Sequence, residues 1–400
     1  MTKKRKIAIV NVFFAPNSIG GATRVVEDNV EALRKNHGDE IDVVVFTTHP
    51  DHKEDYQLNI YPLNGIRVYS LSTVLIDYLE WASENDRVQK IFEEFLEFEK
   101  PDLVHFHCIQ RLTASVLRAS QLRKVPYIVT VHDAWWISDY QFLVDQQGNV
   151  LPEVHEDVLS AHRPPMGISE AQSLDRRMKL KSYLLGAETI LAVSESFADI
   201  YRKSGLTNCE VSKNGVSSGV KWKPKNTKHS ESVILGHFGG MSRHKGYDLV
   251  KEAIKALNSD KIELIVVDHS KGSDFKRKAI WSKCEVTFIG RQPQDSMVQL
   301  YQSIDVLLAP SIWPESYGLV TREATACGCW VVASDIGGIG EDVDEGVNGH
   351  RVKRDSVEDL IRVLELISKD PIKYKGHSKT NFLRKSDDQV AELVNHHYCL

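Results

Sequence analysis

The sequence has no uninterrupted apolar run of the about 18 residues that a membrane-spanning helix needs. Its six cysteines are scattered and form no C-x-x-C motif, so neither a disulfide framework nor a zinc ribbon is predicted. The formal net charge of −5 excludes a chain-wide basic surface for nucleic acid. Basic residues precede the apolar run at 6–13, but no small-residue cleavage site follows them. We therefore interpret that run as a first strand and expect a cytoplasmic protein.

Apolar residues are numerous enough for two cores. The chain has 400 residues, 42% hydrophobic and 26% charged, which suits two domains of roughly 150–200 residues each. Short runs rich in valine and isoleucine alternate with helical patterns, as in parallel sheets covered by helices on both faces. Strands are predicted at 6–13, 41–48, 102–107, 127–133, 189–194, 232–240, 262–268, 286–290, 305–311 and 330–335.

A polar, basic stretch without periodicity, KWKPKNTKHSES, interrupts this alternation and is the best linker candidate. We predict an α/β fold with two Rossmann-like domains, at 1–216 and 232–385, joined by a linker at 217–231. Residues 134–185 have weaker periodicity, and we interpret most of them as an insertion at the ligand-facing edge.

A basic helix ends this insertion. Its charges are Arg176, Arg177, Lys179 and Lys181. One interpretation is an ordinary solvated face, and the other is a surface for an anionic acceptor or for anionic lipid at the inner face of the membrane.

Candidate ligand-binding residues follow the predicted strands, because ligands of open parallel sheets bind beyond the carboxyl ends of the strands. Gly20 and Gly21 follow the first strand, where glycine lets the backbone approach a ligand and helix N–H groups come next. A plain tight turn is an equally good interpretation of that loop. His132 and Asp133 end another strand, so we expect them to face the ligand. The run VHFHC has no third ligand at metal-site spacing, so no metal site is predicted there.

Two loops of the second half carry charge at strand ends. In GHFGGMSRHKG, glycines including Gly240 stand beside Arg243 and Lys245, a combination suited to a diphosphate, although an ordinary basic turn stays open. In WPESYGLVTREA, Glu315 precedes a helix and Glu323 lies about one and a half turns inside it. Carboxylates accept hydrogen bonds from vicinal hydroxyls, so the pair suits a sugar or ribose. Glu315 as a mere helix cap is the alternative.

Together these residues resemble the retaining glycosyltransferases of family 4, which have the GT-B fold, two Rossmann-like domains whose parallel sheets face across a cleft. The resemblance rests on PNSIGGATR, on the Asn-Gly turn in VSKNGV, and on a nearly continuous pattern from FIGRQPQ to DEGVNG. Its centre is the E-x7-E motif from Glu315 to Glu323. It also implies a C-terminal helix, at about 386–400, that packs back on the N-terminal domain.

The resemblance implies a role at each matching position. Glu323 would bind the donor ribose, Lys245 would neutralise the leaving phosphate, and Glu315 would contact the donor sugar. His132 would line the sugar site. Main-chain groups would hold the pyrophosphate and sugar at Ser316, Tyr317, Gly318, Leu319 and Val320. The nucleotide-diphosphate sugar is a substrate, and no cofactor or metal is expected, because cations and helix N-termini stabilise the developing charge.

The chain departs from the family pattern at two places. Gly240 stands where the family has arginine, so either Arg243 reaches the phosphate or one cation is missing. Residues 268–270 replace a Gly-x-Gly, which affects contacts with the base.

The leading hypothesis is retaining transfer of a hexose-type sugar from a nucleotide-diphosphate donor to a hydroxyl of a glycan or glycolipid. Synthesis of a bacterial cell-surface polysaccharide, such as an O-antigen or capsule, is the expected setting. The alternatives are a GT-B sugar-nucleotide epimerase and a catalytically silent protein that binds nucleotide-sugars.

Overall fold

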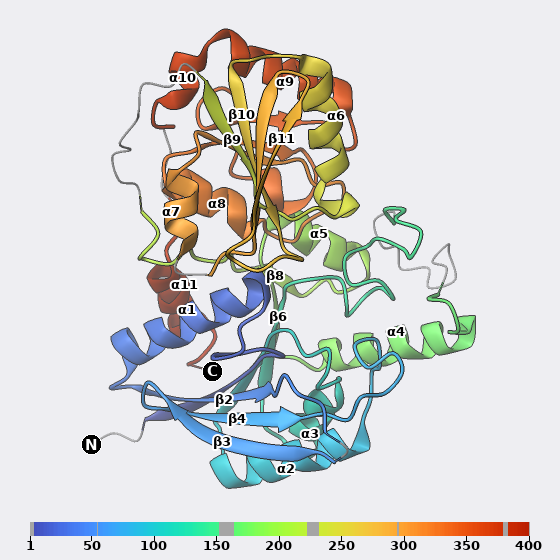
Figure 1. The fold of residues 1–400 in the computed structure, drawn as a ribbon. Helices are drawn as coiled ribbons and strands as arrows, with labels where there is room; N and C mark the ends of the chain where they lie inside the picture. The colour runs from blue at the N-terminus through green and yellow to red at the C-terminus, as the bar shows by residue number, and fades with distance from the viewer. Residues whose placement is uncertain are drawn as a thin grey trace. The chain divides into compact units, whose positions relative to one another are not determined.

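The computed structural model describes residues 4–53, 55–151, 164–221, 232–293, 296–378 and 383–399. It divides into two compact units (Figure 1). Unit 1 comprises Met1–Gln146, Leu151–Ser217 and Arg384–Leu400, and unit 2 comprises Gln147–Val150 and Ser218–Leu383. Most of the predicted linker, at 222–231, and part of the predicted insertion, at 152–163, lie outside the described residues.

Unit 1 is built on an eight-stranded sheet with the order β3-β4-β2-β1-β5-β6-β7-β8. All neighbouring strands pair in parallel except β3, which runs antiparallel to β4. The strands are β1 (Arg5–Val10), β2 (Ile41–Thr48), β3 (Gln57–Leu63), β4 (Ile66–Ser72), β5 (Leu103–Phe106), β6 (Tyr127–Val131), β7 (Thr189–Ala192) and β8 (Cys209–Val211).

Helices cover both faces of this sheet (Figure 1). On β1, Ile7 and Ile9 belong to the core beneath α1 and α11, whereas Ala8 and Val10 belong to the core beneath α2 and α3. Both sets are buried, which explains why residues 7–10 of the strand are all apolar. The helices are α1 (Gly20–His37), α2 (Asp86–Glu99), α3 (Ser115–Arg123), α4 (Glu170–Leu185), α5 (Glu195–Lys203) and α11 (Ser386–His396).

Unit 2 is built on a seven-stranded sheet with the order β11-β12-β10-β9-β13-β14-β15. Its strands are β9 (Val233–His237), β10 (Ile262–Asp268), β11 (Lys276–Trp281), β12 (Cys284–Gly290), β13 (Val306–Ala309), β14 (Trp330–Ser334) and β15 (Gly349–Val352). Its helices are η1 (Arg243–Lys245), α6 (Tyr247–Leu257), α7 (Met297–Gln302), α8 (Leu319–Ala326), η3 (Gly337–Gly340), α9 (Val357–Lys369) and α10 (Pro371–Lys375). Figure 1 shows α6 and α9 on one side of the sheet and α7 and α8 on the other.

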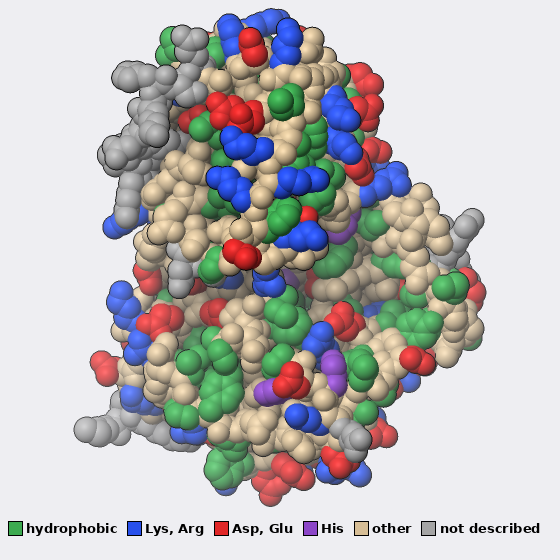
Figure 2. Space-filling model, viewed as in Figure 1, with side chains coloured by type: hydrophobic (Ala, Val, Ile, Leu, Met, Phe, Trp, Pro, Cys, Tyr) green, Lys and Arg blue, Asp and Glu red, His purple; other side chains and the backbone are tan. Residues whose placement is uncertain are grey.

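The edge strand β11 is antiparallel to β12 and begins with three exposed cations at 276–278. Figure 2 shows lysine and arginine side chains over the part of unit 2 where Figure 1 places β11. Charged side chains on an edge strand prevent it from pairing with another chain. The expectation of purely parallel sheets is therefore corrected at both antiparallel edges, β3 and β11.

The basic helix predicted at the end of the insertion is α4, but two of its charges are not on a solvated face. Arg176 and Arg177 are buried. The guanidinium of Arg176 donates to the carbonyl oxygens of Trp81, Ser138 and Trp135 at 2.7, 3.0 and 3.0 Å. Because these charges bind the protein's own backbone, they are not available to a membrane or an acceptor.

The C-terminal helix α11 belongs to unit 1 and packs against α1. Its start is bound to the Asn-Gly turn: the N–H of Gly215 donates to Gln389 at 2.8 Å. A Cβ on Gly215 would lie 2.3 Å from the backbone nitrogen of Ser386. Only glycine therefore lets the two segments come this close. No described helix combines the length and the apolar character needed to cross a bilayer.

A buried carboxylate joins three elements of unit 1. Glu99, the last residue of α2, accepts hydrogen bonds from Arg67 at 2.9 and 2.8 Å, Tyr69 at 2.6 Å and Lys6 at 3.0 Å. Burial alone would raise the pKa of Glu99, but these hydrogen bonds outweigh it and lower the pKa to about 2. The carboxylate therefore stabilises the folded state in its charged form.

We predict that Glu99→Gln lowers the free energy of unfolding at pH 7 by about 1–3 kcal/mol, less than for a fully buried pair because half of Arg67 is exposed. Because folding lowers the pKa of Glu99, its contribution is complete above pH 4.5 and is lost as the pH falls towards about 2. Urea unfolding of both proteins between pH 7 and 2.5 measures this difference. Glu31→Gln, in an exposed pair with Arg34, is the control. A difference that does not change with pH would contradict the assignment.

Candidate functional site

Two of the predicted site residues, Lys245 and Glu315, meet at the carboxyl edge of the second sheet. Lys245 ends η1, which follows β9, and Glu315 lies in the loop after β13. The Nζ of Lys245 donates to Oε1 of Glu315 at 3.0 Å and lies 5.2 Å from the centre of the Trp313 ring. Ser311 donates to the same carboxylate oxygen. The lysine side chain is 26% exposed and the glutamate 9%, so this ion pair can be reached from outside.

The loop that carries Glu315 is held by two glycines with positive φ. Gly337, at φ 66°, packs so closely that a Cβ would lie 2.6 Å from the carbonyl oxygen of Glu315, and the N–H of Gly338 donates to that oxygen. Gly318, at φ 77°, begins α8, and a Cβ there would collide with Ile339. Close packing of the turn at 337–340 thus fixes the loop that leads into α8.

Glu323 lies inside α8 and is 3% exposed. Its Oε2 accepts a hydrogen bond from the hydroxyl of Tyr301, the fifth residue of α7, at 2.8 Å. This bond orients the carboxylate of Glu323.

Residues 316–320 run from the Glu315 loop into the first turn of α8, where backbone N–H groups lack the usual helical acceptor. Arg322, 2% exposed, donates to the carbonyl oxygen of Tyr317 and lies 4.2 Å from that ring's centre. It also pairs with Asp342 at 2.7 Å. Asp342 belongs to a D-x-D triplet, but its carboxylate pairs with Arg322 on α8.

Gly240 is shaped by a residue after the next strand. Its φ is +85°, and a Cβ there would lie 2.6 Å from Cδ2 of His269, which follows β10. The Nε2 of His269 lies 3.0 Å from the carbonyl oxygen of Phe238, so the ring is fastened to the same loop. The two departures from the family pattern, at 240 and at 268–270, are therefore one local rearrangement.

Arg243 begins η1 two residues before Lys245, but it lines a different hollow. The side chains of Arg354 and Ile312 line that hollow with it, whereas Lys245 and Glu315 do not. The sequence left two interpretations open: either Arg243 reaches the phosphate, or one cation is missing. The placement of Arg243 away from Lys245 favours the second, in which the phosphate beside Lys245 lacks the family's second cation.

His132 follows β6 in unit 1, and its Nε2 lies 3.0 Å from Nδ1 of His107, which follows the adjacent strand β5. Both rings are buried. Burial lowers the pKa of His132 to about 4, so the ring is neutral at pH 7. Because Nε2 of His132 is occupied by His107, the Nδ1 side of the ring is the side left for a ligand.

The neighbours of this pair have structural roles. Asp133 accepts hydrogen bonds from Gln110, Gln141 and the N–H of Trp135 at 2.9, 2.7 and 2.9 Å. It therefore braces its loop and is not directed at a ligand. His105 contacts Tyr398 and Thr130 through its two ring nitrogens, each at 2.7 Å. Within the described ranges, no group of three or more His, Cys, Asp or Glu side chains has a metal-binding arrangement.

Gly20 begins α1 with φ +86°, and a Cβ there would meet no other atom within 4 Å. Gly21 is the next residue of that helix, and both are exposed. These glycines and His132 belong to unit 1, whereas the other predicted site residues belong to unit 2.

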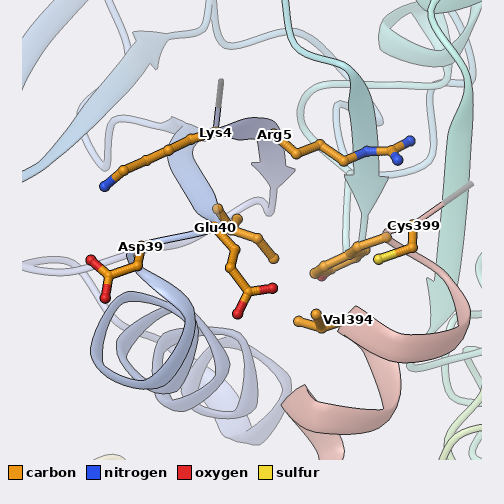
Figure 3. Close-up of a pocket in the computed structure, with 8 residues that line it drawn as sticks. Lys4, Arg5, Asp39, Glu40, Val394 and Cys399 are labelled. Atoms are coloured by element: carbon orange, nitrogen blue, oxygen red, sulfur yellow. The ribbon is translucent and has the colours of Figure 1, made fainter. Parts of the chain in front are cut away.

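Unit 1 has a further hollow of about 230 Å³ at the end of α11 (Figure 3). Figure 3 shows Lys4 and Arg5 extending away from Glu40 in opposite directions. Asp39 and Glu40 balance the two cations, so the lining favours no class of ligand.

Several side chains of the site were not predicted: Ser311, Tyr301 and His269. Ser311 stands at a strand end, the signal that identified Glu315 and His132, and so could have been found. Tyr301 and His269 bond to residues 22 and 31 positions away in the sequence, and no local pattern marks them.

Comparison with known proteins identifies both halves of the chain. Residues 19–219 match the model described as "Glycosyltransferase Family 4", and residues 220–382 match "Glycosyl transferases group 1". An uncharacterized glycosyltransferase of Methanocaldococcus jannaschii is 24% identical over 358 residues, covering 86% of this chain and 84% of that protein. The D-inositol 3-phosphate glycosyltransferase of Actinosynnema mirum is 25% identical over 307 residues, covering 69% and 72%.

Solved structures show the same fold. Sucrose-phosphate synthase from Thermosynechococcus elongatus has a TM-score of 0.67 at 18% identity, covering 98% of this chain and 95% of that one. Anabaena HepE in complex with UDP-glucose has a TM-score of 0.58 at 17% identity, with the same coverages. These are GT-B glycosyltransferases, so the predicted fold class is confirmed.

We predict that Gly240→Ala lowers the free energy of unfolding by about 1–3 kcal/mol. The substitution has two costs: the alanine must adopt a left-handed backbone conformation, and its Cβ collides with the ring of His269. His269→Ala should remove the collision and leave the strain. A double-mutant cycle by urea unfolding should therefore give a coupling of about 1 kcal/mol.

Gly346→Ala is the matched control, because Gly346 has φ +73° and open space around its Cβ position. Gly346→Ala should lower the free energy of unfolding only by the cost of left-handed backbone strain. This cost should be the same whether residue 269 is His or Ala. If the effects of Gly240→Ala and His269→Ala on the free energy of unfolding simply add, positions 240 and 269 do not form one local rearrangement.

We also predict that the free energy of unfolding falls as the pH is lowered from 6.5 towards 4. The pKa of His132 is lowered by burial from 6.5 to about 4, so between these values the unfolded chain binds a proton that the folded chain excludes. One such histidine adds up to about 1.4 kcal/mol per pH unit. His132→Gln should reduce this slope, and His396→Gln, at an exposed ring, should not. Equal slopes in wild type and His132→Gln would contradict the buried neutral form.

Proposed function

This chain belongs to glycosyltransferase family 4, and from that premise we propose retaining transfer of a hexose-type sugar from a nucleotide-diphosphate donor to a hydroxyl of a glycan or glycolipid. The observation that carries this proposal is the Lys245–Glu315 ion pair at the ends of β9 and β13, with Glu323 about one and a half turns inside the following helix α8. The solved complexes of Anabaena HepE with UDP and UDP-glucose support a nucleotide-sugar donor.

The two charges match the charges that the transfer separates. The leaving diphosphate gains negative charge, and Lys245 with the N–H groups at the start of α8 stabilises it. The sugar gains positive charge in an oxocarbenium-like transition state, and the carboxylate of Glu315 beside it is favourable. The hydrogen bond between Lys245 and Glu315 holds each side chain in place, which lowers the cost of ordering them for the reaction.

Glu323 is proposed for the donor ribose, because Tyr301 fixes the orientation of its carboxylate and a carboxylate accepts hydrogen bonds from vicinal hydroxyls. His132 is proposed to line the sugar site as a neutral ring that His107 holds in place. No cofactor is needed for this proposal: lysine, the helix N-terminus and the nucleotide itself supply the groups described above.

The biological setting is proposed on weaker support. Synthesis of a cell-surface polysaccharide or glycolipid fits the family, and a cytoplasmic enzyme at the membrane's inner face remains our prediction. The burial of Arg176 and Arg177 leaves α4 with fewer charges for such contact than the sequence predicted. The silent binding protein stays the alternative, resting on the glycine at position 240, and the turnover measurements below separate it from the transferase.

The proposal is tested by donor binding and turnover. Thermal shifts with UDP, GDP, dTDP, ADP, CMP and their sugars identify the nucleotide, because a ligand bound only by the folded state raises its stability. With that donor, Lys245→Met should lower kcat at least about 100-fold. Glu323→Gln should raise KM for the donor about 10-fold, since it removes a charged hydrogen-bond acceptor.

Retention is checked by NMR assignment of the anomeric configuration of donor and product. Lys251→Met, at a partly exposed lysine of α6, is the control for loss of a lysine, and its kcat should stay within about two-fold. Full transfer activity in Lys245→Met and Glu323→Gln would overturn the roles, and the absence of any nucleotide binding would overturn the function.

A further inference from the structure

A polar hollow lies next to the proposed donor residues on unit 2. It has a volume of about 250 Å³ and is lined by residues 148–150, Arg243, Ile312, Arg354 and Asp355. We call it the Arg243–Arg354 pocket. Residues 147–150 belong to unit 2, so the whole pocket lies within that unit. Its volume is about eight times the ~30 Å³ of a water molecule, enough for a phosphate with part of a sugar.

The pocket stands on the sugar side of the donor site. Arg243, Ile312 and Arg354 follow the ends of β9, β13 and β15, all at the carboxyl edge of the sheet. In the strand order, β15 lies beyond β13 on the side away from β10 and β12. Glu323, proposed for the ribose, bonds instead to Tyr301 on α7, which follows β12.

The short helix η1 separates two cations. The N–H of Ile312 donates to the carbonyl oxygen of His244 at 2.9 Å, which docks the middle of η1 on the loop after β13. Lys245 on one side then bonds to Glu315, and Arg243 on the other lines the pocket. The two cations therefore serve different ligand groups.

The charge of the pocket favours an anion. Two guanidinium groups line it against one carboxylate, that of Asp355. Within the described part of the chain, neither Arg243 nor Arg354 forms a side-chain ion pair, although the backbone N–H of Arg354 donates to Asp335 at 3.2 Å. Gly148 packs against Arg243, where a Cβ would lie 3.4 Å from its Nη1. Guanidinium groups bind phosphate and carboxylate in a bidentate manner.

We propose that the Arg243–Arg354 pocket binds an anionic group of the acceptor, a phosphate or a carboxylate, beside the donor sugar. This inference rests on the proposed function for the position of the donor. The enzyme would thus prefer an acceptor that carries negative charge near the attacking hydroxyl, and Arg243 would not contact the donor diphosphate.

The test compares glucose 6-phosphate with glucose, which differ only in the phosphate, by calorimetric titration of the protein saturated with its nucleotide. We expect glucose 6-phosphate to bind at least about 10-fold more tightly, a difference of about 1.4 kcal/mol. Arg354→Gln and Arg243→Gln should each remove most of this preference. Thermal shifts by the nucleotide should be unchanged in Arg354→Gln, which separates this test from that of the proposed function.

Arg351→Gln is the matched control, because Arg351 is an exposed arginine on β15 that does not line the pocket. An equal loss in Arg351→Gln would reduce the effect to general charge and overturn the proposal. So would equal binding of glucose and glucose 6-phosphate. If Arg243→Gln weakens nucleotide binding instead, Arg243 belongs to the donor site and the proposal fails.

Inorganic phosphate and glucuronate separate the sources of the anion. Inorganic phosphate that binds as tightly as glucose 6-phosphate would show a free-phosphate site and refute an acceptor subsite. Glucuronate that binds with the same dependence on Arg354 would support it and extend it to carboxylates. If the anion preference persists while no nucleotide binds, the pocket stands as an anion site and the proposed function falls.

Discussion

A parallel sheet that is covered by helices on both faces can offer a ligand only the ends of its strands. This constraint organises both units, because residues such as Ile7 and Ala8, neighbours on one strand, are buried in different cores. Polar side chains then collect where strands stop: His132 after β6, Lys245 after β9 and Glu315 after β13. The apolar strands supply no chemistry themselves, but they decide which distant loops become neighbours.

The polar side chains at the strand ends are held in place by other side chains. Lys245 and Glu315 bind each other, Tyr301 orients Glu323, and His107 occupies one nitrogen of His132. Such prior ordering removes conformational entropy that a substrate would otherwise have to overcome. The glycines at 318 and 337 belong to the same arrangement, since their positive φ values and close packing fix the backbone that carries Glu315.

The sequence predicted what depends on local pattern. Unbroken apolar runs identified most of the central strands, but not β4, and charged residues after the strands identified Lys245, Glu315 and Glu323. It did not predict β3 or β11, because exposed edge strands such as β3 lack a continuous apolar run. The burial of Arg176 was also missed, since it depends on carbonyl oxygens contributed by residues 38 to 95 positions earlier. A cationic side chain on a helix looks the same in sequence whether water or backbone surrounds it.

The exchange of arginine for glycine at position 240 shows how a departure from a family pattern is to be interpreted. Taken alone, the lost cation suggests a lost activity. The structure places the His269 ring where that side chain would begin, and the loop adopts a backbone conformation that disfavours any side chain. A cation therefore cannot be restored at position 240 without moving His269. If the transfer proceeds as proposed, the diphosphate depends more strongly on Lys245 and on the N–H groups of α8 than it would beside two cations, because charge stabilisation is divided among fewer donors.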